Sequence, residues 1–199
     1  MGEKMKTTLN CVSALLLLAV AILAVGTYQL SPWRLTVYAC ASDRPVLRAV
    51  AFAILRTKSF DPNQLDGVGA SAASPLGLSL AVLMNAPTEH DRDDAKKVVD
   101  WLLSRGGDLN RPAPPEGWTP LHDAVSLGPW SEPYMRYLLS KGADPNAKAG
   151  SGHFAGRTPL AFAYEIQRAA FKNKSNNPNY DPKYFARPIQ ILKEAHAHE

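Results

Sequence analysis

One short phrase occurs four times in this chain, and it constrains the fold more than any other feature. Its copies, separated by 43, 45 and 39 residues, are Ser31-Pro32-Trp33, Ser74-Pro75-Leu76, Thr119-Pro120-Leu121 and Thr158-Pro159-Leu160. A second phrase alternates with the first and ends in Asp61-Pro62-Asn63, Asp108-Leu109-Asn110 and Asp144-Pro145-Asn146. Two interleaved phrases of this kind predict a structural repeat.

Each phrase has its own local role. A Ser or Thr followed by Pro is typical of a helix start, because the hydroxyl accepts from a free N–H and Pro donates nothing that the helix needs. Residues 98–103 and 134–139 then place apolar side chains at helical spacing, and Gly106 and Gly142 follow them. Glycine at that position ends a helix in the left-handed conformation. The repeat therefore predicts two antiparallel helices and a turn in which Asp and Asn bond their own backbone.

These residues resemble the ankyrin repeat family. Residues 117–124, GWTPLHDA, are similar to the family's G-x-T-P-L-H-x-A, and residues 138–146 to its helix-ending L-L-x-x-G-A-D-x-N. Residues 156–163 are similar but lack the His, and the unit that starts at Ser74 has Gly77 in its place. The resemblance covers about residues 31–199. It implies an all-α ankyrin-repeat solenoid.

We expect about four helix-turn-helix units in one domain spanning residues 29–199. Their approximate limits are residues 31–63, 64–110, 111–146 and 147–199. One helix pair cannot bury its own apolar face, so neighbouring pairs must stack. The side chains expected in the core from the second helices are Trp101, Leu102, Tyr137 and Leu138. The last helix is expected at 188–195, with Pro188 kinking or restarting a helix opened by Pro182.

The N-terminal residues 1–28 predict where in the cell the protein is located. Residues 11–28 are apolar and uncharged, and Lys4 and Lys6 precede them. As a helix, this run would span about 27 Å, close to the roughly 30 Å of bilayer hydrocarbon. We expect a short uncleaved anchor, although a signal peptide cleaved near Ala24 and Gly26 stays open. Under both interpretations, the chain after about residue 29 is exported, and its predicted location is the periplasmic side of a bacterial inner membrane.

Composition and motifs argue against several other classes of protein. The net charge is +4, and the charged residues are scattered along the chain, which argues against a dedicated nucleic-acid binder. With only two cysteines, a disulfide-stabilised scaffold is excluded. His122 belongs to the repeat phrase, where the resemblance implies that it braces adjacent turns. Two groups contain metal-ligand types but match no zinc or calcium spacing: residues 89–94 and residues 196–199. We expect no enzyme, metal, cofactor, nucleic acid or small-molecule substrate.

The resemblance implies that residues flanking the T-P-L phrase and on the first helices carry protein recognition. Those positions are Glu116, Trp118, Ser126, Phe154, Arg157 and Glu165. Trp118 and Phe154 are the strongest candidates, since aromatic side chains dominate many interfaces. The alternative is that Trp118 packs on its neighbouring turn. Trp130 and His153 are weaker candidates.

Three functions follow as hypotheses. The first is a non-enzymatic binding module, namely an immunity-type protein that blocks a secreted toxin such as a hydrolase or phospholipase. It rests on small size, predicted export and a single expected binding surface, and the immunity role itself is an analogy. The second is an envelope scaffold that organises resident membrane proteins. The third, a membrane ankyrin protein facing the cytoplasm, needs the topology opposite to that favoured by Lys4 and Lys6.

Overall fold

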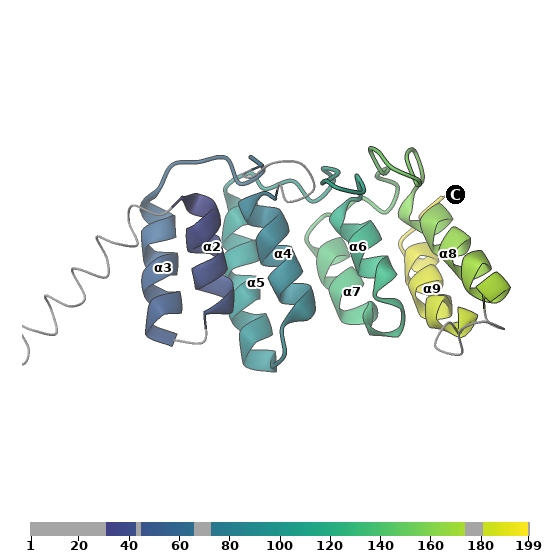
Figure 1. Ribbon diagram of the computed structural model, residues 1–199, viewed down its shortest axis with the longest axis horizontal. Coiled ribbons are helices and arrows are strands. Elements are labelled where there is room, and N and C mark those ends of the chain that lie inside the picture. The colour runs from purple at the N-terminus through teal and green to yellow at the C-terminus, as the bar shows by residue number, and fades with distance from the viewer. Residues whose placement is uncertain (1–30, 43–44, 66–72, 174–180, 199) are drawn as a thin grey trace, which may run out of the picture.

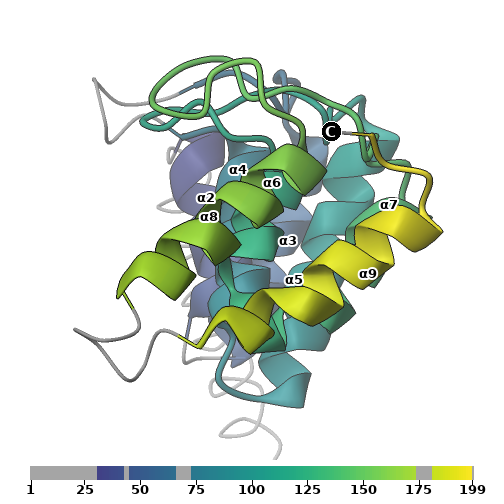
Figure 2. The same cartoon turned by 90° about the vertical axis from the view of Figure 1, so that its right-hand side faces the viewer.

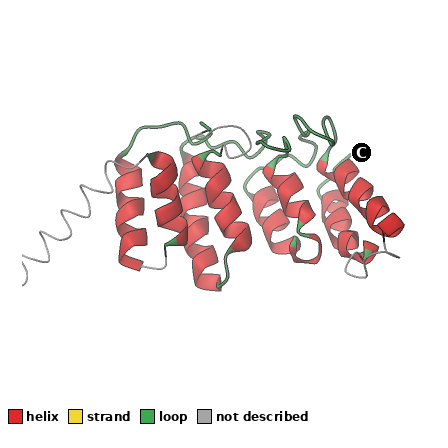
Figure 3. Ribbon diagram, viewed as in Figure 1, coloured by secondary structure: helices red, strands yellow, loops and turns green. Residues whose placement is uncertain are grey.

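The computed structural model describes residues 31–42, 45–65, 73–173 and 181–198, and in these ranges the regular secondary structure is helical (Figure 3). The helices pair in chain order and the pairs lie side by side, with the loops that join them gathered along one edge (Figure 1). The α-helices are α2 (Pro32–Ala41), α3 (Pro45–Thr57), α4 (Pro75–Asn85), α5 (Glu89–Ser104), α6 (Pro120–Ser126), α7 (Glu132–Ser140), α8 (Pro159–Asn173) and α9 (Ala186–Glu194). Two 3-10 helices precede α7 and α9, at Gly128–Trp130 and Pro182–Phe185.

All four copies of the first phrase begin a helix, as the sequence predicts. The first helices of the pairs are α2, α4, α6 and α8, and each has Pro as its first residue. The side-chain oxygens of Ser31, Ser74 and Thr158 accept from the backbone N–H three residues on. Thr119 forms a capping box with His122 instead. These caps satisfy N–H groups that a helix start otherwise leaves free.

The second phrase ends the helices and links the loops. Gly106 and Gly142 both have φ of +93°, which confirms the predicted left-handed helix ends. In each copy, the Asp carboxylate accepts from the backbone N–H of the Asn two residues later, at 2.8 Å. The side-chain oxygens of Asn63, Asn110 and Asn146 then accept from the next loop, at 2.7 Å, from Asp108, Asp144 and His198. This ladder sets the spacing of the loop edge that Figure 2 shows across the ends of the helices.

The core runs between the helix pairs. Leu102 and Leu138 are buried, and Trp101 and Tyr137 are partly buried against the same cluster, as predicted. Cys40 is a buried free cysteine, and burial together with the charge of Asp94 raises the pKa of its thiol to about 12. The core therefore joins residues from α2 through α9.

The C-terminal helix begins two residues earlier than expected. Asp181 caps a 3-10 turn, and α9 follows at Ala186, so Pro188 falls within the first turn of α9. Pro is tolerated there because the first N–H groups of a helix have no acceptor within it. The change from the 3-10 turn to the α-helix therefore falls at Ala186, two residues before Pro188.

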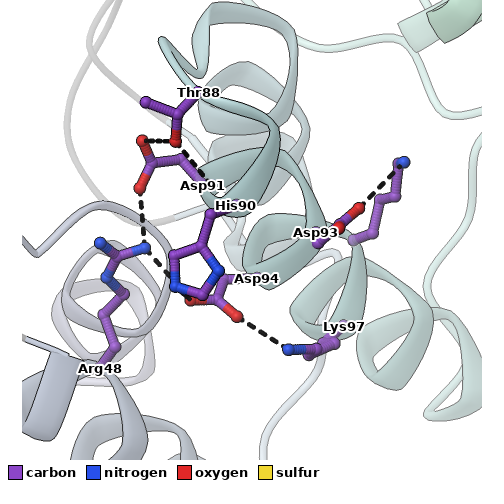
Figure 4. Close-up of polar contacts among 8 residues, drawn as sticks. Arg48, Thr88, His90, Asp91, Asp93, Asp94 and Lys97 are labelled. Carbon is purple, nitrogen blue, oxygen red and sulfur yellow. Dashed lines mark hydrogen bonds and ion pairs between the residues drawn. The ribbon is translucent and has the colours of Figure 1, made fainter.

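The acidic residues at the start of α5 hold α3 in place (Figure 4). Arg48 of α3 places one guanidinium nitrogen 2.8 Å from Asp91 and 3.2 Å from Asp94. The hydroxyl of Thr88 donates to Asp91 at 2.6 Å, and this bond, with Arg48 and against the effect of burial, lowers the pKa of the Asp91 carboxyl. Asp91 and Asp94 therefore bind Arg48 and join α5 to α3.

The predicted anchor or signal segment, residues 1–28, lies outside the described residues. In the described ranges, no helix combines the length and apolar character needed to cross a membrane.

Candidate protein-interaction face

A groove lies on the face formed by the first helices, where the α4/α5 pair meets the α6/α7 pair. We call it the inner groove; its volume is about 290 Å³. One wall is α4 and the other is α6 with the loop at Ala113. Apolar side chains dominate its lining, chiefly Leu80, Ala81, Met84 and Leu127. A second, outer groove of about 930 Å³ lies between α5 and α7 on the other side of the junction.

Asp123 brings a charge into the inner groove. It sits in the first turn of α6 and is partly buried. Burial and the negative charge of Glu116 raise the pKa of its carboxyl from 3.8 to about 6. No hydrogen-bond or ion-pair partner of this carboxylate lies in the part of the chain that the structure describes. At neutral pH, the groove therefore holds an uncompensated negative charge among apolar walls.

Replacing Asp123 by Asn is expected to raise the free energy of unfolding at pH 7 by about 1 kcal/mol, allowing for partial exposure. The folded protein binds the Asp123 proton more tightly than the unfolded chain does, so raising the pH from about 4 to about 6 removes stability. The advantage of the variant should therefore be near zero below pH 4, grow as the pH rises through 6, and be complete by about pH 7. Urea denaturation of both proteins across this range measures it, and a variant less stable at pH 7 would contradict the result.

The inner groove exists partly because α4 lacks a side chain where α6 has one. His122 of α6 is buried, contacts Thr119 Oγ1 at 2.8 Å, and reaches the carbonyl oxygen of Arg157 in the next loop at 3.1 Å. Gly77 holds the matching position in α4 and lines the groove. The hydrogen bonds of His122 confirm the bracing role that the resemblance implied for it. Gly77 has no such side chain, which leaves space beside Pro120.

The two aromatic residues predicted to bind a partner pack against the core. Trp118 and Phe154 are partly buried, and both rings contact Phe162, with centroid distances of 4.9 and 4.7 Å. The indole N–H of Trp118 is buried and finds no acceptor in the described ranges. The structure thus favours the alternative in which Trp118 packs on its neighbours. Their role in binding stays a prediction, and we expect their removal to affect stability.

The other four predicted residues occupy two places. Ser126 is exposed, lines the inner groove, and donates to the backbone carbonyl of Asp123 at 2.7 Å. Glu116 is exposed in the loop and acts on Asp123 through its charge. Arg157 and Glu165 form an ion pair of 2.7 Å on the α8 side. Of these four residues, only Ser126 lines the inner groove, while Arg157 and Glu165 pair with each other.

Asp123 is the residue that sequence reasoning missed. It falls at the variable position of the repeat phrase, immediately after His122, and so carries no motif signal of its own. The departure at Gly77 was the available clue, since a missing side chain on one first helix leaves room beside the next. The weaker candidates Trp130 and His153 are both exposed. Trp130 lines the outer groove.

In the described ranges, no group of three or more His, Cys, Asp or Glu side chains is arranged to hold a metal ion.

Comparison with protein families fits this architecture. The family model of the ankyrin repeat matches residues 116–149, which contain the loop, α6 and α7 of the third helix pair. This match supports the ankyrin family. Ankyrin repeats generally mediate contacts between proteins and are typically non-catalytic, which is consistent with a non-enzymatic binding module. A search of curated proteins finds no match.

Proposed function

We propose that this protein is a non-enzymatic binding module that docks a protein partner on the face made by its loops and first helices. The observation that carries the proposal is the inner groove, which places an uncompensated carboxylate among apolar walls beside an ankyrin repeat. A charge in such a setting lowers the stability of the free protein, and residues of this kind cluster at functional sites. A partner that neutralises Asp123 would recover that loss.

We further propose that the partner is a secreted toxin, such as a hydrolase or phospholipase, and that binding blocks it. Support comes from the sequence: the apolar segment at residues 11–28 and the preceding lysines favour export to the periplasmic side of a bacterial inner membrane. A stack beginning at Ser31 would then lie close to the outer boundary of that membrane. There it would meet an incoming toxin before the toxin reached its target.

Affinity capture with the full-length protein tests this function. The tagged chain is extracted in mild detergent from the organism that makes it, and the bound proteins are identified by mass spectrometry. Capture of a secreted hydrolase that the protein inhibits, together with toxicity of the gene deletion only when that hydrolase is present, is the expected result. Recovery of resident envelope proteins, with an envelope defect in every background, would contradict immunity and establish the scaffold function.

A further inference from the structure

The inner groove is large enough to admit one long side chain. Ligand pockets for whole small molecules run from about 300 to 1,000 Å³, and the inner groove, at about 290 Å³, lies at the lower limit of that range. It is open, and its walls come from two helices of different pairs and one loop. A partner surface can therefore insert a single long side chain between α4 and α6.

Resting on the proposed function, we infer that the inner groove receives an arginine side chain of the partner protein, with its guanidinium paired to Asp123. The charge complementarity is direct, because Asp123 faces the groove without a counter-charge in the described ranges and Glu116 adds a second carboxylate nearby. The apolar walls at Leu80 and Met84 suit the methylene stem of that arginine.

Arginine fits this groove better than lysine does. A guanidinium is more weakly hydrated than an ammonium, so less is lost when it leaves water for a partly buried site. Its planar fork can give two parallel hydrogen bonds to one carboxylate, which a point charge cannot do. Burial and the charge of Glu116 raise the pKa of the Asp123 carboxyl, and a guanidinium paired to it would lower that pKa again.

A small probe tests the site without the partner. Full-length protein in detergent micelles is titrated at pH 7 with N-ethylguanidinium, at constant ionic strength, while backbone amide NMR shifts are recorded. In the wild-type protein, we expect saturable shifts of the amide signals of Leu80, Met84 and Asp123. These shifts should be at least fivefold weaker in Asp123→Asn and unchanged in Asp93→Asn. Asp93 is exposed on α5, away from the groove, and is the matched control. Equal shifts with n-butylammonium, or shifts that survive in Asp123→Asn, would overturn the inference.

The captured partner provides the second test. Its affinity for Asp123→Asn is expected to fall about 10- to 100-fold, as when one member of a buried charge pair is removed. Asp93→Asn should stay within twofold of wild type. The loss cannot come from unfolding, because Asp123→Asn is expected to be the more stable protein. If wild type captures no partner, the proposed function fails; if wild type binds and Asp123→Asn binds equally well, only the arginine site fails.

Discussion

Replacing Phe162 by alanine is expected to lower the free energy of unfolding by about 3–5 kcal/mol, as for other buried phenylalanines. Phe162 is 1% exposed and is the shared contact of an aromatic cluster with Trp118, Phe154 and His122. The substitution leaves a cavity and removes the ring against which Trp118 and Phe154 pack. Chemical denaturation monitored by circular dichroism measures the change.

Phe171 provides the matched control for this substitution. It lies in the same helix, α8, but is 63% exposed, so Phe171→Ala is expected to change stability by less than about 0.5 kcal/mol. A loss below 1 kcal/mol for Phe162→Ala would show that the cluster is not part of the core.

Gly117→Ala is expected to destabilise the protein by about 3–5 kcal/mol, the sum of a left-handed backbone and a steric clash. Gly117 has φ of +71°, and a Cβ at this position would overlap the backbone nitrogen and the hydroxyl oxygen of Ser151 in the next loop. The carbonyl oxygen of Gly117 also accepts from Gly150 at 2.7 Å, so the two loops cannot move apart freely. Thermal denaturation should show a correspondingly large fall in Tm.

Gly142→Ala separates the steric clash from the backbone effect. Gly142 also has a positive φ, of +93°, but a Cβ there would meet no atom within 4 Å. Its substitution is therefore expected to lower stability by only about 1 kcal/mol. Equal losses at Gly117 and Gly142 would contradict the close approach of Gly117 to Ser151.

The elements with strong local signals could be predicted from the sequence. Ser31, Ser74, Thr119 and Thr158 each begin a helix because a hydroxyl and a following Pro satisfy that start without help from distant residues. Gly106 and Gly142 end helices for an equally local reason. The Asp and Asn turns were also predicted, because their hydrogen bonds reach only two residues along the chain. The ladder between loops was not foreseen, since it joins residues 34 to 52 positions apart.

The candidate site depended on contacts between units, and there sequence reasoning was weaker. Trp118 looks like an interface residue by type and position, yet its ring packs on Phe162, more than 40 residues away in the chain. Asp123 carries no motif, and its importance arises from the apolar walls that α4 places opposite it. Neither the groove nor the raised pKa of Asp123 can be obtained without knowing how the second and third helix pairs meet.

Two serines test most directly whether the partner docks on the face of the loops and first helices. Ser126 on α6 lines the inner groove, whereas Ser140 on α7 lines the outer groove. Both are exposed at the last turn of a helix, and both donate to the backbone carbonyl three residues earlier at 2.7 Å. Substitution by Trp therefore removes the same bond and adds the same bulk in each.

We would measure the affinity of the captured partner for wild type, Ser126→Trp and Ser140→Trp by isothermal titration calorimetry. We expect at least a tenfold loss of affinity for Ser126→Trp and a change within twofold for Ser140→Trp. Retained affinity in Ser126→Trp with a loss in Ser140→Trp would place the partner at the outer groove and contradict docking on the first helices.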